Sequence, residues 1–143
     1  MKTLIFIWLT ALLAQPLAIA AQSAAPADSE ALRVRSVIEG QLEAFAADDA
    51  ERAFSFAAPT IRQMFGTAER FMAMVQAGYP VVYRPASVVF LQPEASSGDL
   101  LQAVRMTDAA GAAWLVLYQM QRQADGSWRI AGVDLRPTRG RAI

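Results

Sequence analysis

Residues 113–135, AWLVLYQMQRQADGSWRIAGVDL, decide the fold of this chain. Large apolar side chains alternate with polar or small ones on both sides of Asp125-Gly126. A period of two residues is typical of half-buried strands, and an Asp-Gly pair is a strong signal for a tight hairpin turn. The stretch therefore predicts two antiparallel strands, over residues 113–121 and 128–135.

The same period extends upstream of this hairpin. It predicts a strand over residues 100–107 and, before it, one bent strand that starts at 81–83, breaks at Arg84-Pro85 and continues over 86–91. Residues 92–98 are expected to form a loop. Four strands that follow one another in this way are expected to form an antiparallel sheet.

Before Pro80 the apolar period is 3.6 residues, which is typical of helices. It predicts helices over residues 29–47, 50–57 and 67–78, with a short helical turn between Thr60 and Gly66. Helices followed by a meander of strands indicate an α+β fold, with three N-terminal helices packed on a curved four-stranded antiparallel sheet.

The N-terminus has the features of an export signal. Lys2 precedes an apolar run over residues 4–14, and the small residues that follow include an A-x-A cleavage site. Residues 1–20 are therefore predicted to be a signal peptide, cleaved after Ala20 or Ala21, and the alternative is an uncleaved anchor. Cleavage would give a periplasmic or secreted protein with no membrane anchor.

Three further segments complete the predicted organisation of the chain. Residues 21–28 are expected to be a disordered tether, 29–136 a single domain and 137–143 a frayed tail.

Composition removes many mechanisms and partners. The chain has no His and no Cys, so a Ser-His-Asp triad, a thiolate nucleophile and a thiolate zinc site cannot be built. Its 13 Lys+Arg balance 13 Asp+Glu, which argues against a nucleic-acid partner. We expect no cofactor and no metal.

Two segments resemble known families. Residues 125–131, DGSWRIA, resemble the last hairpin of many nuclear-transport-factor-two-like proteins, a superfamily with a cystatin-like cone. This resemblance implies a cone-shaped sheet that encloses one pocket. Residues 71–85, FMAMVQAGYPVVYRP, resemble the bacterial family known as domain of unknown function 4864. The superfamily includes isomerases, dehydratases and cyclases that use an Asp or a His–Asp pair together with Tyr hydroxyls. Because this chain has no His, the resemblance leaves only the Asp-plus-Tyr version open.

Alternation along the strands assigns residues to the two faces of the sheet. The face with the large aromatic rings is expected to meet the helices, because these rings bury the most area. The predicted pocket lining is then Trp114, Tyr118, Met120, Trp128 and Asp134, with Phe71 and Met74 from the third helix.

Two roles are open for Tyr83 and Arg84. They could gate the pocket mouth, where Arg84 would bind a carboxylate or a phosphate. Alternatively, they form a kinked edge that protects the sheet from pairing with another chain.

The opposite face is too apolar for an exposed sheet. It carries the predicted dimer surface, which consists of Leu101, Ala103, Leu115, Leu117 and Val133. An apolar centre with a polar rim is typical of a homodimer contact, and the alternative is that the chain's own tail covers it.

Two functions follow from these assignments. The first is a non-enzymatic module that binds a small apolar ligand or a partner protein. The second is an isomerase- or cyclase-like enzyme in which Asp134 is the general base and Tyr118 donates to an oxyanion.

Overall fold

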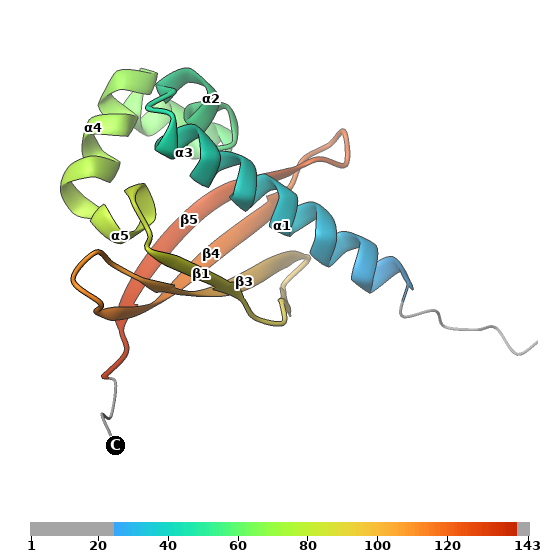
Figure 1. Cartoon of the computed structure of the whole chain (residues 1–143). Helices are drawn as coiled ribbons and strands as arrows, with labels where there is room; N and C mark the ends of the chain where they lie inside the picture. The colour runs from blue at the N-terminus through green and yellow to red at the C-terminus, as the bar shows by residue number, and fades with distance from the viewer. Residues whose placement is uncertain (1–24, 140–143) are drawn as a thin grey trace, which may run out of the picture.

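The computed structural model describes residues 25–139, in which five helices precede the sheet (Figure 1). The helices are α1 (Ala25–Ala46), α2 (Ala50–Ser55), α3 (Pro59–Phe65), α4 (Ala68–Gly78) and α5 (Pro80–Tyr83). The strands are β1 (Ser87–Phe90), β2 (Glu94–Ser96), β3 (Asp99–Thr107), β4 (Ala113–Arg122) and β5 (Trp128–Pro137). This confirms the α+β class. The predicted signal peptide and its cleavage site lie outside the described residues.

Local sequence explains where the helices begin. The Asp49 carboxylate accepts from the Arg52 backbone N–H at 3.1 Å, and the Thr67 hydroxyl oxygen accepts from the Arg70 N–H at 3.2 Å. Each cap satisfies a donor that the first helical turn leaves unpaired. Helix α1 starts earlier than the sequence predicts, at Ala25 within the segment expected to be a tether.

The helices lie on one side of the sheet. Figure 1 shows α1 running across one face of the strands, with α2 to α5 gathered near its C-terminal end. The core lies between these layers, and its side chains are almost fully buried: Val34, Ile38 and Phe45 from α1, and Val104, Met106, Val116, Tyr118 and Met120 from β3 and β4. No described helix covers the other face.

The sheet is antiparallel and open, in the order β1-β3-β4-β5, and β2 also pairs with β3. The expected count of four strands was therefore too low, because residues 94–96 in the predicted loop add a short strand against β3. The predicted strand start at 81–83 was also wrong. Pro80 opens helix α5 there, with the Tyr83 N–H donating to the Tyr79 carbonyl at 3.0 Å. Proline has the φ angle of a first helical turn, and burial of Val81 and Val82 holds the turn against the core.

A β-bulge divides strand β5 into two parts. Met120 pairs with Ile130 and Gln119 pairs with Gly132, so β5 contains one extra residue, Ala131. Beyond the bulge Val133 pairs with Tyr118 and points toward the helices. The alternation predicted for 128–135 therefore inverts at its midpoint.

The first part of β5 also pairs with the connection between α2 and α3. The Ala58 N–H donates to the Ile130 carbonyl at 2.8 Å, and the Ile130 N–H donates to the Phe56 carbonyl at 2.9 Å. Gly40 of α1 lets the Phe56 ring of this connection pack against the helix, because a Cβ there would lie 2.7 Å from the ring. This pairing ends at Ile130, where the bulge begins. Beyond the bulge, the edge of β5 that faces the helices is not paired with residues 56–58.

Candidate functional site

An apolar cavity of about 270 Å³ lies between the helices and the bulged part of β5. It is enclosed on the helical side by α1, α3, α4 and α5, and on the sheet side by residues 130–133. Its lining consists of Gln41, Phe45, Ala57, Ile61, Met64, Phe65, Phe71, Met74, Val75, Tyr79, Val82, Ile130, Ala131, Gly132 and Val133. No Asp, Glu, Lys or Arg belongs to this lining.

Aromatic packing fixes the helical wall of the cavity. The Phe71 ring centroid lies 6.1 Å from that of Phe45, 5.4 Å from that of Phe54 and 5.9 Å from that of Phe65. Tilted and edge-on pairs at such distances are the favoured aromatic arrangements. Met64 and Met74 lie nearby, and the Met64 side chain is 74% exposed. The cavity therefore has a rigid aromatic wall and flexible thioether side chains that can adapt to a guest.

Two polar side chains interrupt the apolar lining. Gln41 is 3% exposed, and its Nε2 donates to the Ala53 carbonyl at 3.1 Å. The Tyr79 hydroxyl donates to the Val133 carbonyl at 3.5 Å, which is long for a hydroxyl hydrogen bond. Both residues border the cavity.

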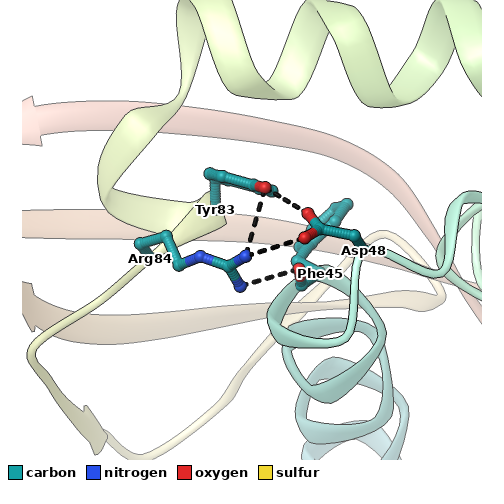
Figure 2. Close-up of polar contacts among 4 residues, drawn as sticks. All are labelled: Phe45, Asp48, Tyr83 and Arg84. Carbon is teal, nitrogen blue, oxygen red and sulfur yellow. Dashed lines mark hydrogen bonds and ion pairs between the residues drawn. The ribbon is translucent and has the colours of Figure 1, made fainter.

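A polar cluster closes the neighbouring end of the helical layer (Figure 2). Arg84 donates from Nη1 to the Phe45 carbonyl at 2.9 Å and from Nη2 to the Asp48 carboxylate at 3.1 Å. The Tyr83 hydroxyl donates to the same carboxylate, and the Arg84 guanidinium lies 4.4 Å from the Tyr83 ring centroid. We name these four residues the clasp. It ties the end of α1 to the end of α5, and both helices supply cavity walls.

The clasp shows where Tyr83 and Arg84 lie. Neither residue lines the cavity, and both are occupied by Asp48 and the end of α1. Arg84 forms an ion pair with the Asp48 carboxylate of the same chain. Asp48 has a φ of +52°, and the chain turns there after the end of α1.

The predicted lining residues fall into three places. Phe71 and Met74 line the cavity. Met120 lies in the core, fully buried. The two tryptophans lie elsewhere: Trp114 donates from Nε1 to Asp108 at 3.1 Å, and Trp128 donates to Glu30 at 2.8 Å beside Arg122.

The proposed catalytic pair is not assembled. Tyr118 is fully buried on the inner face, and its hydroxyl has no hydrogen-bond partner among the described residues. Burial raises the pKa of this phenol far above its usual range. Asp134 pairs with Leu117 on the outer face, where its carboxylate accepts from Arg136 at 3.1 Å. The bulge at Ala131 causes this separation, because it turns Asp134 away from the helices.

The predicted dimer residues are placed with one correction. Leu101, Ala103, Leu115 and Leu117 are half-buried on the outer face. Val133 belongs to the cavity instead, since the bulge brings it to the inner side. The bulge therefore exchanges Asp134 and Val133 between the two faces.

Sequence reasoning missed Gln41 and Tyr79. A signal for Gln41 was present, because it interrupts the apolar stripe Ile38, Leu42 and Phe45 on one face of α1. Tyr79 gave no comparable signal, since its position between Gly78 and Pro80 is typical of a helix end.

Within residues 25–139, no cluster of acidic side chains has the spacing of a metal site. No helix in that part of the chain combines the length and apolar character needed to cross a membrane.

The fold and its cavity define a small α+β domain whose helices and bulged edge strand enclose a pocket without charged residues. The chain belongs to the family described as domain of unknown function (DUF4864), whose model matches residues 27–143. Neither a curated protein nor a solved structure gives a significant match to the chain.

Proposed function

We propose that this protein is a non-enzymatic module that binds a small apolar molecule in the cavity beside β5. The proposal rests on the lining of the 270 Å³ cavity, which contains no charged side chain and is mostly aliphatic, aromatic and thioether. Preformed apolar pockets with a few polar groups are the usual form of small-molecule sites. The enzymatic alternative is not retained, because Asp134 and Tyr118 lie on opposite faces of the sheet.

Filling the cavity from within is the direct test. Val75 is 5% exposed and lines the cavity from α4, so Val75→Phe places a ring in the space a ligand would occupy. Val89→Phe makes the same change on an exposed strand position outside the cavity. The probe is N-phenyl-1-naphthylamine, an uncharged dye whose fluorescence rises in apolar surroundings.

We expect the wild type and Val89→Phe to bind the dye with similar affinity, and Val75→Phe to bind it at least about tenfold more weakly. Thermal unfolding checks that both variants are folded. If the wild type does not bind the dye, or if Val75→Phe binds it as tightly as the wild type does, the cavity is not the ligand-binding site.

Three further features belong to the same proposal. The export signal in residues 1–20 suggests that the ligand is met in the periplasm or outside the cell. Helices on one face of a sheet with a pocket between them support membership of the nuclear-transport-factor-two-like superfamily and its cone. Two copies are proposed to associate through the outer face, the residues Leu101, Ala103, Leu115 and Leu117, which no described helix covers.

Opposite charges support a twofold contact of the outer face. Arg105 and Arg136 lie at its border together with Asp134. A twofold axis brings each patch against its own copy, so the arginines of one protomer can face the carboxylate of the other.

A further inference from the structure

The polar groups of the cavity restrict which apolar molecule fits it. We infer that the ligand is uncharged and carries a hydroxyl group, an alcohol or a phenol, whose proton is donated to the Gln41 Oε1. This inference rests on the proposed function, because it names the ligand class of the same cavity.

The orientation of the Gln41 amide follows from its partner. The Ala53 carbonyl can only accept, so the amide presents Nε2 to it, at 3.1 Å. Oε1 must then point to the other side of the amide. No hydrogen bond to Oε1 forms within the described residues.

The Gln41 oxygen is nevertheless not sealed in the core. Among the described residues, the Tyr118 hydroxyl is the one side-chain polar atom that is both buried and unpaired. Gln41 is 3% exposed and lines the cavity, so we place the accessible surface of its unpaired Oε1 on the cavity side. The cavity therefore offers a hydrogen-bond acceptor among apolar side chains. A ligand without a donor would exclude water from this acceptor and give it no hydrogen bond in return.

The Tyr79 hydroxyl supplies the complementary group. Its bond to the Val133 carbonyl is 3.5 Å long, so the hydroxyl can turn to donate to a guest at little cost. A hydroxyl group can both donate and accept, so its chemistry matches the Gln41 acceptor and the Tyr79 donor of the lining. A carboxylate cannot donate to Oε1, and it would find no cation in the lining.

Three ligands of one shape separate these chemistries. Naphthalene has no polar group, 2-naphthol adds a hydroxyl, and 2-naphthoate adds a carboxylate. Their affinities are measured by displacement of N-phenyl-1-naphthylamine from the wild type, from Gln41→Met and from the control Gln76→Met. Gln76 is exposed on α4. Met keeps the length of the glutamine side chain and removes its acceptor.

We expect 2-naphthol to bind the wild type and Gln76→Met about tenfold more tightly than either other ligand, as one good hydrogen bond allows. In Gln41→Met this preference should fall below about twofold while the affinity for naphthalene is kept. Retained naphthalene binding shows that the variant is folded around an intact cavity. Tyr79→Phe should lower the affinity for 2-naphthol more than the affinity for naphthalene.

Two results would overturn the inference and leave the proposed function standing. One is a wild type that binds naphthalene or 2-naphthoate as tightly as 2-naphthol. The other is a Gln41→Met variant that keeps the full preference for 2-naphthol. If the wild type bound neither the dye nor any of the three ligands, the proposed function itself would be refuted.

Discussion

The clasp between α1 and α5 makes a prediction whose size can be worked out from its contacts. Arg84→Met removes the hydrogen bond to the Phe45 carbonyl, the ion pair with Asp48 and the stacking on Tyr83. Hydrogen bonds to charged groups contribute about 1.5 kcal/mol at the low end of their range, which suits a half-buried contact. The exposed ion pair and the exposed stacking contribute about 0.5 kcal/mol each.

The variant is therefore expected to lose about 2.5 kcal/mol of the free energy of unfolding, with the carbonyl bond as the largest contribution. For a domain of this size the Tm should fall by about 10 °C. Asp48→Asn keeps an acceptor for Tyr83 and tolerates the left-handed φ, so it should cost only about 0.5 kcal/mol.

Chemical denaturation monitored by circular dichroism measures these differences. Arg62→Met is the matched control, because its guanidinium lies 5.3 Å over the Phe54 ring and makes no hydrogen bond or ion pair within the described chain. It should cost less than about 1 kcal/mol. The reasoning is wrong if Asp48→Asn destabilises as much as Arg84→Met, or if 1 M NaCl removes most of the Arg84→Met effect, because either result would make the ion pair dominant.

Two further predictions concern acid stability and assembly. The hydrogen bond from Arg122 holds the pKa of Glu30 below its usual range, as the Trp114 and Ser127 hydrogen bonds do for Asp108 and Asp125. Because the pKa values of these carboxyl groups are lower in the folded state, their contacts stabilise the fold above the unfolded pKa values of about 4. This stabilisation is lost as the pH falls through the folded pKa values. The free energy of unfolding should therefore decline below about pH 4.5, and less steeply in Glu30→Gln; equal slopes between pH 4.5 and 2.5 would contradict this. For assembly, Leu117→Arg should sediment as a folded monomer where the wild type sediments as a dimer, and a monomeric wild type at high micromolar concentration would exclude the proposed contact.

The sequence predicted the elements whose signals are local. Alternation over residues 113–121 and the Asp125-Gly126 pair correctly predicted the β4–β5 hairpin, and Gly126 has the φ of +83° that such a turn requires. The inner positions of β4 were also correct, with Val116, Tyr118 and Met120 fully buried. These features depend on residues that are neighbours in the chain.

The part of the sheet that borders the site could not be predicted in this way. The bulge at Ala131 arises from pairing β5 with two separate segments, β4 on one edge and residues 56–58 on the other. A single extra residue inverts every later side chain, so Asp134 leaves the predicted pocket and Val133 enters it. No period within residues 128–135 records that shift.

The sequence by itself therefore determined the α+β class, the hairpin and the apolar faces of the helices, because periodicity and turn residues act over a few positions. Only the tertiary structure decided which side of β5 meets the helices, that Arg84 binds Asp48, and that the Gln41 amide donates to the Ala53 carbonyl. Each of these depends on contacts between segments far apart in the chain, and such contacts are set by packing rather than by local preference.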